Sequence, residues 1–281
     1  MSIAPEERFF GPFAVLHALD LPSSSASDLY EGFYAGFYDT FTRDEDWDVE
    51  RYVQEARSAG GAVLELACGS GRIALPLARA GIEVHGIDLA PDMLKVLAKR
   101  AAAEPPEVGE RIHSMVGDMT QLDLGRRFGL VVLGATSLCL LHTPAQRERL
   151  FASVAAHLAD GGRFLFDMTI TSPEQLRAQD DQLLTLPATS ARFKRFTLLG
   201  RKWVPEDGLQ LVNFYSEVVA ADGATRRFLG STAKAVLDAA AVVAELERAG
   251  LRLLAREPVL EPGDPTGDRI DLFTCAAARS R

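Results

Sequence analysis

Cysteine is scarce in this chain, and its spacing excludes two common uses of the residue. The 281 residues contain three cysteines, Cys68, Cys139 and Cys275, and no two of them form a CxxC pair. The sequence therefore predicts neither a zinc site nor a disulfide framework. An odd, scattered set of thiols is typical of a reducing compartment, so we expect a cytoplasmic protein without a resident metal.

The chain also lacks long apolar runs and a surplus of positive charge. No uninterrupted hydrophobic run reaches the length of a membrane-spanning helix. The N-terminal segment MSIAPEERFF carries charges where a signal peptide has its apolar core. The formal net charge is −9, whereas nucleic-acid binders usually show a basic surface, because phosphate contacts carry much of their affinity. We expect neither a transmembrane segment nor a nucleic-acid partner.

Short apolar runs that alternate with helical patterns dominate the middle and the end of the chain. The expected strands are 62–66, 83–87, 111–116, 128–133, 163–167, 251–256 and 270–276. The expected helices between them are 73–80, 91–103, 144–158 and 237–249. This alternation predicts an α/β fold, a Rossmann-like seven-stranded, mostly parallel sheet with helices on both faces.

Two further segments flank or interrupt this core. Residues 1–27 lack a clear pattern and read as loop, and the aromatic stretch DLYEGFYAGFYDTF then begins a helical part. Strand-like runs separated by Glu-Asp-Gly and Ala-Asp-Gly turns predict an inserted antiparallel meander. We therefore expect an N-terminal helical lid at 1–60, a Rossmann-like core at 61–171, the meander at 172–232 and the end of the core at 233–281.

A glycine loop follows the first core strand, in the segment VLELACGSGR from Val63 to Arg72. Glycines such as Gly69 and Gly71 let a backbone approach a ligand closely, and the following helix start favours a carboxylate or phosphate. The motif alone is weak, since through Ala74 it also fits a loose GxGxxA dinucleotide pattern.

Two acidic residues follow the next two strands and make the pattern more specific. Asp88 lies about 17 residues beyond Gly71, where an acid at a strand tip holds ribose hydroxyls; its alternative role is to cap the helix that begins at Pro91. Asp118 and Met119 follow the third strand, where a carboxylate accepts from an adenine amino group and a thioether packs on the ring.

Taken in order, these segments resemble the class I S-adenosylmethionine-dependent methyltransferases. The resemblance covers residues 61–167 and the last two strands, through VLELACGSGRIALPLARAG, VHGIDLAPDML, MVGDM, FGLVVLGATSL and LADGGRFLFDM. Glu65 ahead of the loop and the LAPDML phrase after Asp88 are features of methyltransferases and not of dehydrogenases. The resemblance implies S-adenosylmethionine as the cofactor and S-adenosylhomocysteine as its product.

The resemblance also implies roles for the loop that follows the first strand. Glu65 would organise the loop and interact with the ammonium group of the cofactor through water or backbone. Ala67, Gly69 and Gly71 would shape the methionine pocket. Arg72 departs from the more common Thr or Tyr, and it either meets the cofactor carboxylate or points to solvent.

The remaining cofactor contacts implied by the resemblance lie after later strands. Asp88 would bind ribose, Leu89 and Met93 would flank adenine, and Asp118 with Met119 would complete that pocket. Ala135 and Thr136, just beyond the fourth strand, would face the sulfonium and the methyl acceptor.

The class of acceptor is indicated by the segments outside the core. No Asn-Pro-Pro-Tyr type motif follows the fourth strand, which argues against adenine or glutamine as the acceptor. The aromatic N-terminal helix and the meander are similar to small-molecule N-methyltransferases, including glycine-type and aminosugar N,N-dimethyltransferases. This resemblance would place Tyr38 at the cofactor and Tyr34 or Tyr30 at the acceptor. The equally weighted alternative is that the aromatic stripe only packs on the core and contacts no ligand.

His142, soon after the fourth strand, is either a base or acceptor contact, or a structural residue. The stretch FYDTFTRDEDWDVERYVQEA resembles methyltransferases of ribosomally made, amine-bearing peptides of the daptide type. We therefore expect N-methylation of an amine on a specialised metabolite or modified peptide. A small-molecule O-methyltransferase, a nicotinamide-dependent reductase and a non-catalytic regulator or partner subunit stay open, as does a homodimer.

Overall fold

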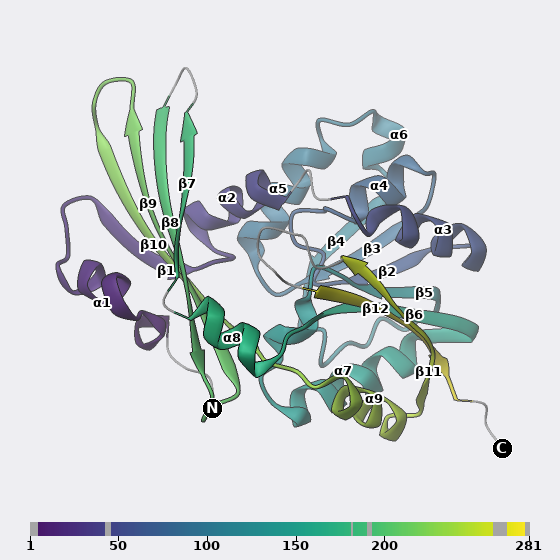
Figure 1. Cartoon of the computed structure of the whole chain (residues 1–281). Helices are drawn as coiled ribbons and strands as arrows, with labels where there is room; N and C mark the ends of the chain where they lie inside the picture. The colour runs from purple at the N-terminus through teal and green to yellow at the C-terminus, as the bar shows by residue number, and fades with distance from the viewer. Residues whose placement is uncertain (1–4, 43–45, 181, 190–192, 261–268, 279–281) are drawn as a thin grey trace. The chain divides into compact units, whose positions relative to one another are not determined.

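The computed structural model describes residues 5–42, 46–180, 182–189, 193–260 and 269–278 (Figure 1). The chain divides into two compact units. Unit 1 comprises Met1–Tyr34 and Ser172–Val236, and unit 2 comprises Ala35–Thr171 and Leu237–Arg281. None of the described helices is long and apolar enough to cross a membrane.

Unit 2 contains a seven-stranded sheet whose order is β11-β12-β6-β5-β2-β3-β4. Its strands are β2 (Val63–Leu66), β3 (Val84–Asp88), β4 (Ile112–Val116), β5 (Phe128–Leu133), β6 (Leu158–Ile170), β11 (Leu251–Leu260) and β12 (Arg269–Ala277). The five strands from β4 to β6 are parallel, and β12 is antiparallel to both of its neighbours. The predicted seven-stranded, mostly parallel sheet is confirmed.

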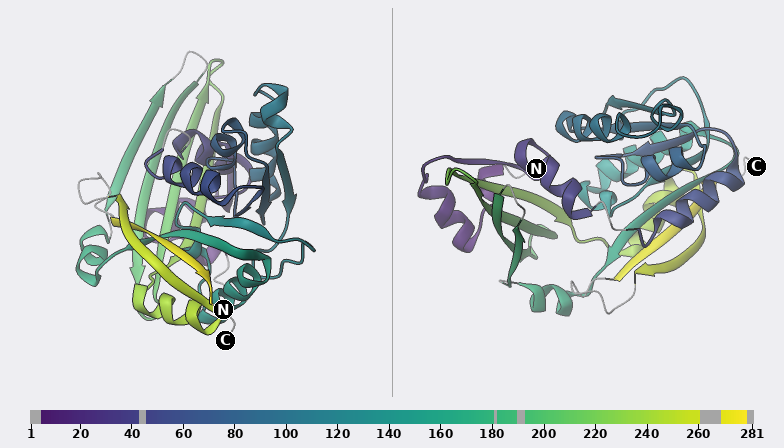
Figure 2. Two further views of the ribbon diagram at one scale, coloured as in Figure 1. Left: turned by 90° about the vertical axis from the view of Figure 1, so that its right-hand side faces the viewer. Right: turned by 90° about the horizontal axis from the view of Figure 1, so that it is seen from above.

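Helices cover both faces of this sheet, because its central strands are apolar on both sides. The helices that lie wholly in unit 2 are α3 (Val49–Ala59), α4 (Ala74–Arg79), α5 (Pro91–Ala101), α6 (Pro106–Gly109), η2 (Ser137–Leu140), α7 (Pro144–His157) and α9 (Ala239–Arg248), and α2 (Gly32–Thr42) crosses the boundary between the units. Val63 packs with Tyr52 of α3 on one face, and Leu64 packs with Phe151 of α7 on the other. Helices α7 and α9 lie side by side (Figures 1 and 2).

Unit 1 contains a five-stranded sheet with the order β1-β10-β9-β8-β7. Its elements are η1 (Pro5–Arg8), α1 (Gly11–Ala18), β1 (Ser24–Asp28), α8 (Pro173–Gln179), β7 (Leu183–Thr189), β8 (Phe193–Val204), β9 (Leu209–Ala220) and β10 (Thr225–Ala235). Strands β7, β8, β9 and β10 pair with one another in antiparallel order, as expected for a meander. The sequence predicts three strand-like runs in this region, and β7 is an additional strand.

The expectation of a loop at 1–27 is wrong, because this segment forms α1 and most of β1. Strand β1 pairs in parallel with Arg227–Ser231 at the edge of the unit 1 sheet. An edge strand is held by main-chain pairing and needs no alternating apolar side chains, so the serine-rich sequence gave no strand signal. Within the predicted lid at 1–60, residues up to Tyr34 fall in unit 1 and those from Ala35 in unit 2; the role of this segment as a lid stays a prediction.

Candidate cofactor site

The glycine loop connects β2 to α4 with three residues in the left-handed region. Ala67 has φ 51°, Gly69 has φ 54° and Gly71 has φ 85°. A Cβ on Gly71 would lie 2.4 Å from Cδ1 of Leu97, and one on Gly69 would lie 3.1 Å from Cε of Met93. Glycine is thus required at both positions, since the loop runs directly over the side chains of α5.

Asp88 ends β3 and fastens the glycine loop to its neighbours. Its Oδ2 accepts a hydrogen bond of 2.7 Å from the backbone N–H of Gly69, and its Oδ1 accepts one of 2.8 Å from Ala90. A carboxylate offers about four acceptor positions, so these bonds leave capacity for two hydroxyl groups. Burial raises the pKa of Asp88, and the backbone hydrogen bonds partly oppose that effect.

The two predicted adenine neighbours occupy different environments. Leu89, next to Asp88, is 71% exposed and presents an apolar side chain at the end of β3. Met93 is 2% exposed, and its Cε lies beneath Gly69. The structure therefore places Met93 as a support of the loop, whereas Leu89 is available to a ligand.

Asp118 and Met119 follow β4 at the same edge of the sheet. The backbone N–H of Gly117 donates to the carbonyl oxygen of Asp88 at 2.9 Å, which holds the two strand ends together. Burial alone would raise the pKa of Asp118, but hydrogen bonds from Thr120 and Gln121 outweigh it and lower the pKa. An ionised acceptor therefore stands beside Met119, which is half-buried against the core.

Glu65 is a buried acid on β2, the middle one of the five parallel strands. The residue is 3% exposed, and its Oε2 has no hydrogen-bond partner within the described part of the chain. Burial raises its pKa to about 8, while Arg72 acts in the opposite direction. An unpaired buried acceptor costs about 1–3 kcal/mol, so this position suits a ligand that brings a hydrogen-bond donor.

Arg72 is buried and not exposed to solvent, so the solvent-facing alternative is wrong. Its Nη1 and Nη2 lie 2.5 and 2.8 Å from Oδ1 and Oδ2 of Asp48, which is fully buried. The guanidinium also lies over the ring of Trp47, 5.5 Å from its centroid. The ion pair joins the glycine loop to the start of α3; contact with a cofactor carboxylate stays a prediction.

A second buried carboxylate, Asp167 on β6, shapes the turn after β5. It accepts hydrogen bonds from the hydroxyl of Tyr52 at 2.8 Å, from the backbone N–H of Ala135 at 3.0 Å and from the N–H of Thr136. Burial and the charge of Asp48 raise the pKa of Asp167 to about 6. The turn is therefore held by side chains from two other elements.

Strained backbone gathers at this edge of the sheet. Five described residues other than glycine have positive φ, and three of them are Ala67, Ala135 and Thr136. Each such residue costs about 1 kcal/mol or more, and residues of this kind cluster at ligand sites. The loop after β2 and the turn after β5, on neighbouring strands, thus face the same edge.

Sequence reasoning missed the buried partners Asp48, Tyr52 and Asp167. Asp48 and Tyr52 are four residues apart on one side of a helix, and Asp167 ends the predicted fifth strand. An acid at the carboxyl end of a parallel strand was an available signal for Asp167. The pairing of Asp48 with Arg72 had no local signal.

Tyr34 is a core residue and not an acceptor contact, so its proposed catalytic role is corrected. The side chain is fully buried, and its hydroxyl donates to the carbonyl of Phe228 at 2.8 Å and to Ser216 at 3.3 Å. The adjacent Phe33 stacks on Phe228 with ring centroids 3.8 Å apart. Phe33 and Tyr34 of the aromatic stripe therefore pack inside unit 1, which for these residues is the alternative given above.

We expect Tyr34→Phe to lower the free energy of unfolding by about 1–2 kcal/mol, because a buried carbonyl loses its donor. Affinity for S-adenosylhomocysteine should not change. Urea unfolding and calorimetry measure the two quantities. Loss of ligand affinity at unchanged stability would restore a role for Tyr34 in the site.

Tyr38 and His142 keep their predicted roles as hypotheses. Tyr38 is half-buried on α2. His142 is half-buried between η2 and α7, directly before the capping residue Thr143. Both lie in unit 2, with the loop and the turn described above.

Comparison with known proteins identifies the same part of the chain. A methyltransferase domain family matches residues 63–162. The chain is 32% identical over 142 residues to putative methyltransferase YqeM of Bacillus subtilis, which covers 50% of this chain and 55% of the relative. It is 27% identical over 128 residues to the cypemycin N-terminal methyltransferase of a Streptomyces species, and the match covers 46% of this chain and 50% of the relative.

A third relative acts on an aminosugar. It is the dTDP-3-amino-3,4,6-trideoxy-alpha-D-glucopyranose N,N-dimethyltransferase of Streptomyces venezuelae, 29% identical over 136 residues, which are 48% of this chain and 54% of the relative. The chain thus spans about half the length of the curated relatives it matches. Among solved structures, S-adenosylmethionine-bound CalS10, an amino pentose methyltransferase from Micromonospora echinaspora, has a TM-score of 0.66 at 23% identity, covering 88% of this chain and 98% of that one.

S-adenosylmethionine fits the residues at this edge of the sheet. Glu65 offers an unpaired buried oxygen to the ammonium group, Asp88 has acceptor capacity for the ribose hydroxyls, and Leu89 offers an exposed apolar surface to the base. Residues 63–162 match a methyltransferase domain family, and the chain is similar to aminosugar N-methyltransferases.

Proposed function

We propose that this protein is an S-adenosylmethionine-dependent N-methyltransferase that acts on an amine of a specialised metabolite or of a ribosomally made modified peptide. The buried, unpaired Oε2 of Glu65 carries the cofactor part of the proposal. The aminosugar and cypemycin enzymes among the relatives, both of which methylate nitrogen by name, support the acceptor part.

In this proposal the residues of unit 2 bind and orient the reactants. Bound S-adenosylmethionine would supply an electrophilic methyl group on a sulfonium. Glu65 would hold the ammonium end, and Asp88 would hold the ribose. Ala135 and Thr136, fixed by Asp167, would form a rigid wall near the reacting groups. Alignment and exclusion of water account for most of the acceleration in such transfers.

The acceptor nitrogen needs a free lone pair, so an amine must lose its proton before or during transfer. We assign this proton to His142, because imidazole is the side chain that most often acts as a general base. A cytoplasmic location is proposed from the three free, buried cysteines Cys68, Cys139 and Cys275. Assembly as a homodimer also stays a prediction.

The activity test presents matched acceptors to the full-length protein with S-adenosylmethionine. We would incubate aminosugar nucleotides and peptides with a free amine, each beside its hydroxyl analogue, and follow methylation by mass spectrometry. We expect methyl gain on amines alone. Methyl gain on the hydroxyl analogue alone would make the protein an O-methyltransferase, and no transfer to a broad set of acceptors would favour a binding role.

The raised pKa of Glu65 predicts that cofactor binding depends on pH. Its pKa in the empty site is about 8, and a bound ammonium group would lower it, so the complex holds fewer protons than the free protein. Affinity for S-adenosylhomocysteine should therefore rise by roughly one order of magnitude or more between pH 6 and pH 8. Calorimetry in buffers of different ionisation enthalpy would detect the released proton.

Glu65→Gln is the matched variant for this pH dependence. It should bind S-adenosylhomocysteine more weakly at pH 8 and show a flat pH profile. The pKa of Glu65 is raised above its ordinary value of 4.5, so the empty wild-type protein should lose stability as pH rises toward 8, and the variant should lose less. Identical pH profiles for both proteins would contradict the assigned role of Glu65.

A further inference from the structure

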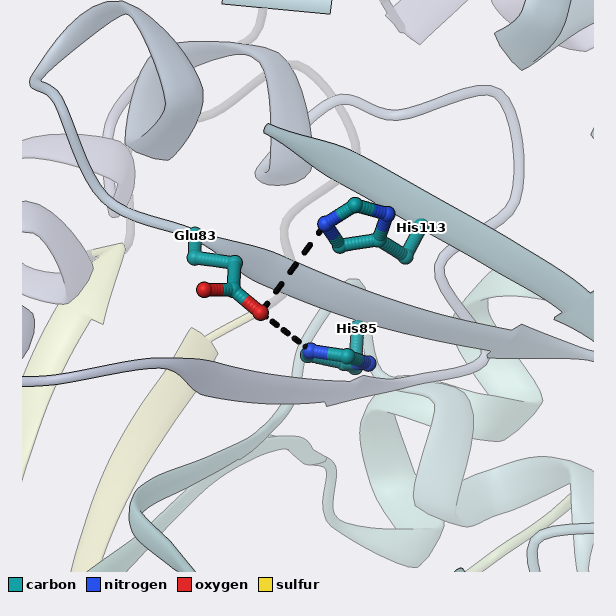
Figure 3. Close-up of side chains that lie close together, drawn as sticks. All are labelled: Glu83, His85 and His113. Atoms are coloured by element: carbon teal, nitrogen blue, oxygen red, sulfur yellow. Dashed lines mark hydrogen bonds and ion pairs between the residues drawn. The ribbon is translucent and has the colours of Figure 1, made fainter. Parts of the chain in front are cut away.

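Three side chains that are potential metal ligands meet at the amino-terminal edge of the unit 2 sheet. Glu83 immediately precedes β3, and His85 on β3 is the register partner of His113 on the edge strand β4. Figure 3 shows the carboxylate of Glu83 next to both imidazole rings. The sequence predicted no metal site, because these residues belong to separate segments that only the parallel pairing brings together.

The ligand atoms of the cluster are close to one another. Nε2 of His85 lies 2.7 Å from Oε1 of Glu83, and Nε2 of His113 lies 3.8 Å from the same oxygen. One nitrogen from each ring and one carboxylate oxygen all lie within 4.8 Å. Ligand atoms on a tetrahedral zinc ion are roughly 3.3 Å apart, so His85 would move slightly away from Glu83 and His113 slightly toward it to bind one ion.

The guanidinium group of Arg126 lies close to the ligand atoms of the cluster. Nη1 of Arg126 lies 2.8 Å from Nε2 of His85 and 3.6 Å from Oε1 of Glu83. The same imidazole nitrogen cannot both donate to Glu83 and accept from Arg126, because it carries either a proton or a lone pair. A metal ion would take a lone pair from each of the three ligands, and Arg126, half exposed over Phe128, is free to turn outward.

We propose that Glu83, His85 and His113 form a surface site for a divalent transition-metal ion of the zinc type, which fastens the edge strand β4 to β3. Two imidazoles and one carboxylate are a common zinc ligand set with an open fourth position for water. Magnesium is excluded by chemistry, because it prefers oxygen ligands in octahedral geometry. The site is separate from Asp88, which lies five residues along the same strand, roughly 16 Å away.

The test measures zinc binding to the full-length, tag-free protein by calorimetry, with thermal unfolding as a second readout. We expect one zinc ion per chain and a rise in Tm of about 2–5 °C at saturating zinc, with no effect of magnesium. His113→Asn and His85→Asn should each weaken zinc binding about tenfold or more. His17→Gln, which changes a histidine of unit 1, should bind zinc like the wild type.

Arg126→Gln gives a test that loss of folding cannot imitate. Removing the competing guanidinium should strengthen zinc binding, while circular dichroism shows an unchanged fold. The proposal is overturned if wild-type protein binds no zinc, or if His113→Asn and His85→Asn bind it as tightly as wild type. Binding of S-adenosylhomocysteine tests the cofactor site independently and should be the same in all four variants.

Discussion

Asp88→Ala should lower the affinity for S-adenosylhomocysteine by about 100-fold or more and leave the chain folded. Asp88 is the proposed partner of the ribose hydroxyls, and hydrogen bonds to a charged group contribute about 1.5–3 kcal/mol. The substitution also frees the N–H of Gly69, which the carboxylate now holds at 2.7 Å. Both losses fall mainly on ligand binding, because Asp88 is half-buried at the carboxyl end of β3 and lies outside the core.

Two variants control this result. Asp92→Ala removes a neighbouring acid whose carboxylate pairs with Lys95 on the surface, and it should bind the ligand like the wild type. Asp88→Asn keeps the side-chain volume and one acceptor oxygen, so it should show an intermediate loss of about tenfold. Wild-type affinity in Asp88→Ala, measured by calorimetry, would break the assignment of the ribose position.

Arg72→Ala should lower the free energy of unfolding by about 3–5 kcal/mol, because it leaves the carboxylate of Asp48 buried without a partner. Asp48 is fully buried and the Arg72 side chain is 8% exposed, so solvent cannot replace the lost charge. The position of the glycine loop also depends on this pair. We therefore expect weaker ligand binding in any fraction that remains folded.

A double variant separates charge pairing from packing. Arg72→Met combined with Asp48→Leu removes both charges and keeps apolar volume, so it should be less destabilised than Arg72→Ala alone. Arg72→Lys should not restore the free energy of unfolding, since an ammonium group cannot make both hydrogen bonds to the carboxylate of Asp48. Urea unfolding of the four proteins gives the comparison; a loss below about 1 kcal/mol in Arg72→Ala would contradict the account.

Local sequence patterns were sufficient to predict the core of unit 2 and the cofactor edge. The strand before Gly69 is apolar except for Glu65, Asp88 ends its strand, and Asp118 comes two residues after the end of β4. Because parallel strands bring their carboxyl ends to one edge, these positions in sequence fix their neighbourhood in space. The hydrogen bond from the backbone N–H of Gly69 to the carboxylate of Asp88 shows that the glycine loop and Asp88 lie together, as predicted.

Features that depend on residues far away in the sequence could not be predicted from local sequence patterns. Strand β1 exists because β10 offers it main-chain partners, and nothing in Ser24–Asp28 announces this. Arg72 is buried because Asp48, from a separate helix, neutralises it. Tyr34 carries the same aromatic pattern whether it lines a site or a core, and only its hydrogen bond to Phe228 decides between them.

Calorimetry of the wild-type protein with S-adenosylhomocysteine, with NADH as the control, tests the central claim most directly. The account predicts saturable binding of S-adenosylhomocysteine with a micromolar dissociation constant, and no heat of binding from NADH. Binding of NADH alone would mean that the glycine loop serves a nicotinamide dinucleotide, and the methyltransferase proposal would then be wrong.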